Sequence, residues 1–412
     1  MKKITYILVT IIAISLVSFY LIYSPGFPKG DFMFDYIVNP EDIHSAKDFS
    51  FAVFFMLVDK KENLFISPYS LHSALSIVYT GADGQTKEEM ANVLGVSELE
   101  LEDFKKASLE LKKHLEQTTK ESEVSIANAL FLKNNYLFLE NFKRDAEKYF
   151  EAKIDHLPET GKPINEWVTK NTNNKIKDII DSGPIDEKTV AILLNAVHFK
   201  APWGIVFEKS ETSKRVFFGN RKANVDMMER EGNYKHLILE NLKAVSINYK
   251  SEFSSKARYV FHAIMPEKGL ADFYQNFDIE KFNQLKEEMK KDEIILRVPK
   301  FKIENNFSLV GTLEIMGMQK AFDMREANFA NMVGIEKEEN VFISDVIHKT
   351  FVEIDEEGTE AAAVTFEPME PESIYEPGKK PKILEFNKPF LFIIEEVETG
   401  TILFIGHLVD PS

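Results

Sequence analysis

The sequence predicts an α+β fold, with helices concentrated in the first half of the chain and a large sheet assembled from distant segments. Apolar residues recur at helical spacing early in the chain, whereas the segments after Val190 are short, β-branched and aromatic. The 412 residues include 34 Phe and 13 Tyr, which are enough to build a large aromatic core. Because no linker or fixed repeat follows Gly30, we expect residues 31–412 to form a single domain.

The first thirty residues form a segment of a different kind. Lys2 and Lys3 precede an uncharged run, Ile4–Tyr23, which ends at a Ser-Pro-Gly break. As a helix, a run of this length reaches ~30 Å, the thickness of a bilayer core. The two lysines favour an N-terminus inside and a body outside. We therefore expect residues 1–30 to be a membrane anchor, with a cleaved signal peptide as the alternative, and the body to be extracytoplasmic, either secreted or membrane-anchored.

Two early segments have the periodicity of packed helices. Residues 46–59 place four apolar side chains on one face, and residues 71–80 are apolar with interspersed small side chains. A third helix is expected to begin at Thr86, which would act as its N-cap. Glu88 and Glu89 would then lie in the first turn, where the helix dipole favours negative charge.

The second half of the chain contains segments with the length and composition of strands. Five of them are β-branched and aromatic: Val190–Phe199, Ala257–Met265, Ile294–Ile303, Val341–Ile354 and Phe390–Ile394. Since they are widely separated along the chain, the sheet they form must join distant parts of the sequence.

Composition excludes several functional classes. A net charge of -16 argues against nucleic-acid binding, which requires a basic face, and the absence of Cys excludes disulfides, thiolate metal sites and a Cys nucleophile. None of the nine His has a paired metal-binding spacing, and neither a nucleophile elbow nor a glycine-rich phosphate loop occurs. We therefore expect a protein that is not an enzyme and has no metal site and no cofactor.

The most informative segment begins with a good strand near residue 348 and ends in a long loop rich in Pro and Glu. Between them, Thr359, Ala361, Ala363 and Thr365 fall on one face at a period of two, and all four are small enough to enter a crowded sheet. An ordinary flexible hairpin loop is the alternative interpretation. The small residues favour an arm that can become a strand.

With this segment, the sequence resembles the serpin family over about residues 44–411. Residues 356–365 are similar to the serpin hinge, and other pieces match the family in order: Asn63–Ser70 with Gly81-Ala82, Ile164–Ile176, Leu194–Lys200 with Trp203 and Phe207, Val298–Phe301, Gly317–Phe322, and Phe386–Gly406. Each piece alone is weakly specific, but all of them in order are strongly specific.

The resemblance implies a serpin fold, in which helices pack around a large mixed sheet and smaller sheets and a reactive loop is exposed. It also implies a suicide inhibitor of serine proteases, acting as a monomer without a cofactor. The protease cuts the loop, forms an acyl-enzyme and is trapped when the hinge arm inserts as a new strand, and serpins are themselves a general example of such strand addition. The alternative is a non-inhibitory serpin that acts as a carrier or chaperone.

Matching positions imply residue roles. The hinge comprises Glu356, Glu357, Gly358, Thr359, Glu360, Ala361, Ala362 and Ala363. The shutter, a polar cluster beneath the sheet, comprises Ser67, Ser70, Asn195 and His348. Trp203 matches the breach tryptophan beneath the insertion point. We expect Thr359 to be the first side chain that inserts, to be exposed before cleavage, and there to tolerate substitution by Arg.

Counting along the loop from the start of the hinge puts the reactive bond between Glu372 and Ser373. Glu on the acyl side implies a glutamyl-specific serine protease as the target. Met369, Ile374 and Tyr375 are alternatives that would suit elastase-, chymotrypsin- or subtilisin-like proteases.

Two residues depart from the pattern expected of an inserting arm. Glu367 continues the inward face, and Pro368 would lie within the new strand. A buried charge and a missing backbone N–H both cost stability. The sequence therefore predicts that insertion is slow or stops early.

Overall fold

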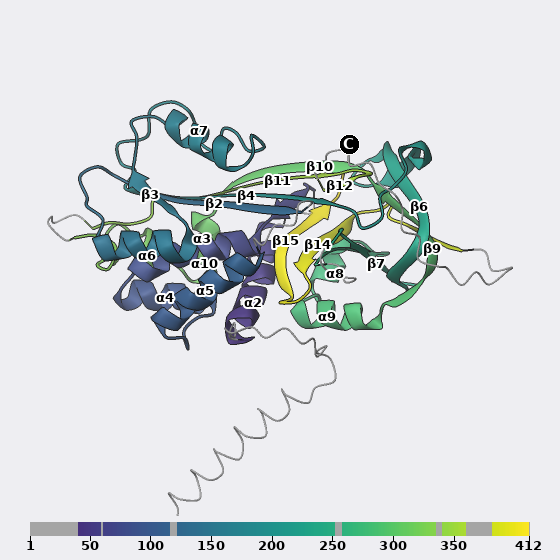
Figure 1. Ribbon diagram of the computed structural model, residues 1–412, viewed down its shortest axis with the longest axis horizontal. Helices are drawn as coiled ribbons and strands as arrows, with labels where there is room; N and C mark the ends of the chain where they lie inside the picture. Colours follow the sequence, from purple (N-terminus) through teal and green to yellow (C-terminus); the bar gives the residue numbers. More distant parts are fainter. Residues whose placement is uncertain are drawn as a thin grey trace, which may run out of the picture. The chain divides into compact units, whose positions relative to one another are not determined.

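The computed structural model describes residues 40–58, 61–115, 122–251, 258–334, 340–359 and 381–411, with side chains from Phe49 onward. They belong to one compact unit, Val38–Ser412. Two sheets and a set of helices make up this unit, so the predicted α+β class is confirmed (Figure 1). The apolar segment at residues 1–30 lies outside the described residues.

The main sheet contains a short strand inserted between two longer parallel strands. It has six strands in the order β10-β11-β12-β4-β2-β3. Their bounds are β10 Phe301–Ser308, β11 Asp345–Ile354, β12 Gly358–Thr359, β4 Ala191–Pro202, β2 Glu123–Leu132 and β3 Lys153–His156. Strands β4 and β11 are parallel and pair directly, from Ile192 beside Asp345 to Val197 beside Thr350. Beyond that point β12 lies between them, antiparallel to both.

A second, nine-stranded sheet lies beneath one end of the main sheet (Figure 1). Its strands are β1 Leu64–Ile66, β15 Thr401–Leu408, β14 Phe390–Glu396, β8 Tyr259–Pro266, β7 Leu242–Asn248, β6 Lys222–Ile238, β9 Lys290–Pro299, β13 Lys382–Glu385 and β5 Ser213–Phe218. Aromatic side chains fill the core between the sheets. The rings of Phe65 and Phe404 stack with centroids 5.0 Å apart, and the ring centroid of Phe199 in the main sheet lies 5.7 Å from that of Phe404. The expected aromatic core is thus found where the two sheets face each other.

Helices cover both faces of the main sheet. They are α2 Pro40–Leu57, α3 Pro68–Gly81, α4 Gly84–Leu94, α5 Leu101–Leu115, α6 Glu140–Phe150, α7 Lys162–Asn171, α8 Leu270–Tyr274, α9 Ile279–Glu288 and α10 Val310–Met316, with 3₁₀ turns η1 Lys209–Glu211 and η2 Lys320–Phe322. In Figure 1, α7 lies above the sheet and the other helices lie below it. Ile164 and Val168 of α7 share a core cluster with Leu194 and Ala196 of β4. Because β4 is covered on both faces, it is an almost continuous apolar run.

Two expectations about the elements are wrong in detail. The third helix begins at Gly84 with Asp83 in the N-cap position, and Thr86 lies inside its first turn, where its hydroxyl accepts a hydrogen bond from Asn328 N–H. The expected strand Ile294–Ile303 is two strands, β9 and β10, in different sheets. The chain changes sheets at Lys300, whose N–H donates to Asp226 O of the second sheet. A local apolar pattern cannot show such a change of partner.

Candidate functional site

The start of the hinge already lies inside the main sheet. After β11 the chain reverses in a tight turn, in which Asp355 N–H donates to Gly358 O at 3.0 Å and Asp355 Oδ1 accepts from the N–H groups of Glu357 and Gly358. Thr359 then pairs with Ala201 on one side and with Ile354 on the other. Gly358 and Thr359 therefore form a short strand between β4 and β11.

Gly358 and Thr359 fit this place closely. Gly358 has φ of +152°, and a Cβ atom there would lie 2.2 Å from Ala201 O, so a larger residue would have to displace backbone. The Thr359 side chain is fully buried and forms a 2.6 Å hydrogen bond with the hydroxyl of Tyr249. The expectation that Thr359 is exposed before cleavage and tolerates Arg is therefore wrong, since a guanidinium would have to enter this packed site.

Charged groups hold the two glutamates that precede Gly358. Glu356 is buried and binds Lys300 Nζ at 2.7 Å and the Thr212 hydroxyl at 2.8 Å. Burial alone would raise the pKa of Glu356, but Lys300 and Thr212 outweigh it and lower the pKa below its ordinary value. Glu357 pairs with Lys209 at the surface at 2.7 Å. These contacts fix the end of β11, so that the arm leaves it in one direction.

Trp203 lies against the turn that joins β11 to β12. Its indole Nε1–H donates to Asp355 O and its backbone N–H donates to Glu357 O, both at 2.9 Å. The ring stacks on Tyr249 with centroids 4.7 Å apart. The Trp203 indole therefore contacts the turn, and the stacked Tyr249 phenol contacts Thr359.

The shutter residues form one hydrogen-bonded cluster beneath the middle of the main sheet. Asn195 of β4 donates through Nδ2 to Ser70 O at 3.1 Å and to Asn128 Oδ1 at 2.7 Å. Asn195 Oδ1 lies 2.6 Å from His348 Nδ1 on β11, and Ser67 N–H donates to His348 Nε2 at 3.1 Å. Asn195 and His348 are register partners, so this bond directly joins β4 and β11.

His348 is neutral in this cluster. Because Ser67 N–H donates to Nε2, that nitrogen carries no proton, and Nδ1–H donates to Asn195 Oδ1. Complete burial lowers the pKa of His348 from 6.5 to about 3. Protonation of Nε2 would turn the acceptor for Ser67 into a second donor and break the contact with α3.

Acid should therefore weaken the folded state through His348. The unfolded chain binds a proton on this ring below pH 6.5, whereas the folded chain does so only near pH 3. The contribution of neutral His348 to the free energy of unfolding is complete above pH 6.5. As the pH falls below that value, the folded state loses about 1.4 kcal/mol of stability per pH unit until the pKa of the folded state is reached. Because burial also lowers the pKa of His72 to about 4, His72 adds to the slope in the parent and in His348→Gln alike. In urea unfolding between about pH 6 and pH 5, the free energy of unfolding should therefore fall by about 1.4 kcal/mol per pH unit more in the parent than in His348→Gln. Equal slopes in the two proteins would contradict this role of His348.

The sequence search missed residues that complete the site. Asn128 of β2 joins the shutter, and the only sequence signal for it is one polar residue in an apolar strand. No local pattern indicates Tyr249 or Lys300, since their importance comes from contacts with Thr359 and Glu356, which lie 110 and 56 residues away along the chain.

The structure also contains a buried Ser-His-Glu arrangement that no sequence motif indicates. The Ser246 hydroxyl lies 2.9 Å from His262 Nδ1, and His262 Nε2 lies 3.0 Å from Glu395 Oε2. Burial alone would raise the pKa of Glu395, but His262 and Lys286 outweigh it and lower the pKa to about 2. All three members of the arrangement are buried, and the Ser246 hydroxyl contacts Met289 Sδ at 3.1 Å. A substrate could not reach this serine without opening the fold, so the arrangement is structural.

The remaining predicted site residues lie outside the described residues: Glu360, Ala361, Ala362, Ala363, Glu367, Pro368, Met369, Glu372, Ser373, Ile374 and Tyr375. Within the described ranges, no helix combines the length and apolar character that a membrane crossing requires.

Comparisons with known proteins agree with this geometry. The family profile described as "Serpin (serine protease inhibitor)" matches residues 44–411. Iripin-2 from Ixodes ricinus is 30% identical over 362 residues, which cover 84% of this chain and 88% of Iripin-2. Tengpin, a thermophilic serpin solved in its native state, is 30% identical with a TM-score of 0.82, and the match covers 92% of this chain and 96% of tengpin.

The same fold occurs in a relative described by its ligand. Human thyroxine-binding globulin, solved in complex with thyroxine, is 26% identical with a TM-score of 0.80, and the match covers 91% of this chain and 100% of that chain. The fold alone therefore includes both inhibitors and a binding protein. The family profile spans nearly all of the described residues, and the predicted serpin fold is confirmed: this chain belongs to the serpin family.

Proposed function

We propose that this serpin is a suicide inhibitor of serine proteases and is not an enzyme. One observation carries the proposal: Gly358 and Thr359 already lie between β4 and β11, which pair directly only as far as Val197 and Thr350. An arm cut free at its far end could continue along this path as a central strand antiparallel to both neighbours.

The register supports small residues as the inserting face. Since Thr359 pairs with Ala201 and Ile354, each further residue advances one step along β4 and β11. Ala361 would come beside Phe199 and Val352, which are both buried on the core side. A large side chain would not fit there, so the alanine in this sequence suits insertion.

The same register gives a role to the shutter. Thr365 would come to lie between Asn195 and His348 and would replace their hydrogen bond with bonds to its own hydroxyl. Insertion must first break this bond and the direct β4–β11 pairs, so the uncleaved protein is held in a kinetic trap. Cleavage removes the tether of the arm, and the new strand pairs and buried surface then stabilise the inserted form.

A carrier without inhibitory activity is the second candidate, which the likeness to thyroxine-binding globulin favours. Incubation with a panel of glutamyl-specific, chymotrypsin-, subtilisin- and elastase-like serine proteases distinguishes the two. An inhibitor should give a covalent adduct on a denaturing gel, and mass spectrometry should detect a released peptide that begins at Ser373. Clean cleavage without an adduct would favour the carrier. A released peptide that begins at Glu370, Ile374 or Glu376 would move the reactive bond.

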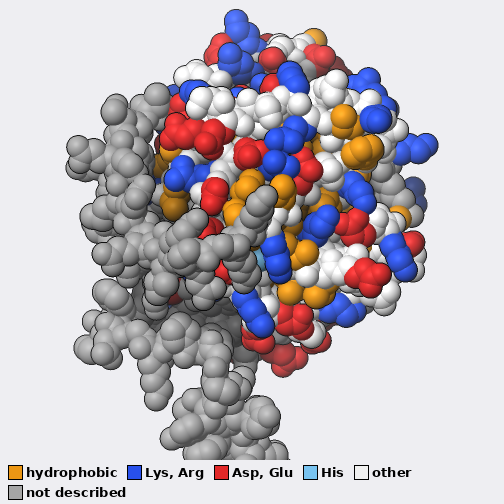
Figure 2. Space-filling view, turned by 90° about the vertical axis from the view of Figure 1, so that its right-hand side faces the viewer, with side chains coloured by type: hydrophobic (Ala, Val, Ile, Leu, Met, Phe, Trp, Pro, Cys, Tyr) orange, Lys and Arg blue, Asp and Glu red, His pale blue; other side chains and the backbone are white. Residues whose placement is uncertain are grey.

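We also propose that the body acts outside the cytoplasm as a monomer and does not bind nucleic acid. The apolar run with Lys2 and Lys3 before it supports export, and an exported body can meet extracellular proteases. Basic and acidic side chains are interspersed on the face in Figure 2, unlike the continuous basic surface that nucleic acid selects. Carbonate extraction of membranes tests the anchor: the native protein should stay in the pellet, whereas a soluble form that begins near residue 24–30 would show cleavage.

A further inference from the structure

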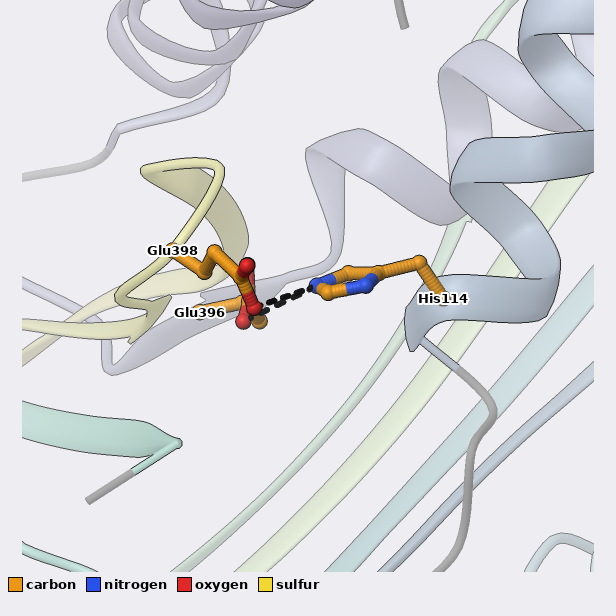
Figure 3. Close-up of side chains that lie close together, drawn as sticks. All are labelled: His114, Glu396 and Glu398. Atoms are coloured by element: carbon orange, nitrogen blue, oxygen red, sulfur yellow. Dashed lines mark ion pairs between the residues drawn. The ribbon is translucent and has the colours of Figure 1, made fainter. Parts of the chain in front are cut away.

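Three side chains that can bind a metal meet at the end of α5. His114 is the penultimate residue of α5, Glu396 is the last residue of β14, and Glu398 follows in the turn to β15 (Figure 3). His114 Nε2 lies 3.2 Å from Glu396 Oε1 and 3.7 Å from Glu398 Oε2. One ligand atom from each residue lies within 4.8 Å of the other two.

The two separations from His114 Nε2 are close to the edges of a tetrahedral metal site. Metal–ligand bonds of about 2.0–2.2 Å at tetrahedral angles put neighbouring ligand atoms about 3.3–3.6 Å apart. In Figure 3 both carboxylates lie in front of Nε2, as ligands around a shared ion do. The His114–Glu396 contact is close, but it does not have the alignment of a hydrogen bond.

The buried carboxylate provides an independent observation. The Glu396 side chain is fully buried, and its Oε2 accepts hydrogen bonds from Thr399 N–H at 2.8 Å and from the Thr399 hydroxyl at 2.6 Å. Its Oε1 is also buried and, apart from the contact with His114 Nε2, accepts no hydrogen bond from the described residues. A buried carboxylate oxygen of this kind costs stability unless a cation shares it.

The surrounding contacts hold the three ligands in place. Glu396 pairs with Tyr259 across β14 and β8, and the Tyr259 hydroxyl donates to Leu115 O at 2.7 Å. Leu115 follows His114, so this bond fixes the end of α5 relative to the strand that carries Glu396. Such supporting contacts orient ligands and strengthen metal sites.

We propose that His114, Glu396 and Glu398 bind a divalent transition-metal ion of the Zn²⁺ class, with water as the fourth ligand. An imidazole nitrogen and two carboxylates suit Zn²⁺, whereas Ca²⁺ requires six or more oxygen ligands and Mg²⁺ requires octahedral geometry. The ion ties α5 to the β14–β15 turn, and the folded state therefore gains stability when the metal is present.

Titration calorimetry with ZnCl₂ tests this site in the full-length, chelator-treated chain in mild detergent at neutral pH. The parent should bind one ion tightly. His114→Gln and Glu398→Gln should each weaken binding at least about 10- to 100-fold. Glu110→Gln is the matched control, because it removes a carboxylate one turn earlier on α5 and should leave binding unchanged. Excess Mg²⁺ or Ca²⁺ should not compete.

Equal zinc affinity in the parent and in both ligand variants would overturn the proposal, because the ion would then bind elsewhere. No saturable binding in the parent would also overturn it. If the variants fold poorly, Co²⁺ added to the parent decides. Visible bands of tetrahedral intensity support the site, and the weak spectrum of octahedral hydrated Co²⁺ contradicts it.

Discussion

Ala361→Arg should convert the protein from an inhibitor into a substrate. In the proposed inserted state this side chain would face Phe199 and Val352, both of which are buried. A guanidinium there would be desolvated without a partner, at a cost of several kcal/mol. Cleavage itself should continue, since the reactive bond lies further along the loop. The acyl-enzyme would then hydrolyse before insertion, so the covalent adduct on a denaturing gel should disappear while cleaved protein accumulates.

Glu360→Arg is the matched control, because it introduces the same side chain one residue earlier on the opposite face. In the proposed register it would lie beside Lys200 and the exposed Glu353, where the new charge can stay hydrated. This variant should keep most of its adduct formation. If Ala361→Arg trapped the protease as well as Glu360→Arg does, the arm would not follow the register set by Thr359.

Thr359 is not a suitable position for this substitution, because its side chain is already buried in the uncleaved protein. A face of small residues at a period of two is visible in the sequence, and Thr359 does face the core. The place of Gly358 and Thr359 between β4 and β11 depends on the turn at Asp355 and on the hydrogen bond between Thr359 and Tyr249. These contacts join distant segments, so no local pattern contains them. Substitution of Thr359 would therefore damage the uncleaved fold and the insertion together.

The shutter, too, could be predicted from the sequence only in part. Ser67, Ser70, Asn195 and His348 could be identified because they lie in motifs that match the family in order, and the structure brings all four together. Asn128 carries no motif of its own and is recognised only by its bond to Asn195.

The metal-ligand cluster was beyond the reach of sequence spacing for a similar reason. Ligand motifs depend on residues a few positions apart on one element, whereas His114 and Glu396 come from a helix and a strand far apart in the chain. The expectation that the protein has no metal site rested on this spacing argument. Fold topology, through β14 and the end of α5, is what brings the three side chains to one point.

Glu367→Thr should make the protein a more efficient inhibitor. The register that follows Thr359 would bring Glu367 between Leu193 and Val346, which are both fully buried in the main core. A carboxylate without a cation partner there opposes insertion by several kcal/mol, whereas Thr continues the small inward face. Fewer inhibitor molecules should then be consumed for each protease trapped, and the cleaved form should melt at a higher temperature.

Glu376→Thr separates this effect from a simple change in loop charge. It removes the same charge beyond the proposed reactive bond, from a segment that would not enter the sheet, so its stoichiometry of inhibition and its cleaved-form melting temperature should match the parent's. An equal gain in both variants would mean that the protease responds to loop charge rather than to insertion depth. No gain in Glu367→Thr would mean that the arm stops before residue 367. Thr365 would then be the last inward residue, and the shutter gap between Asn195 and His348 would be the end of the inserted strand.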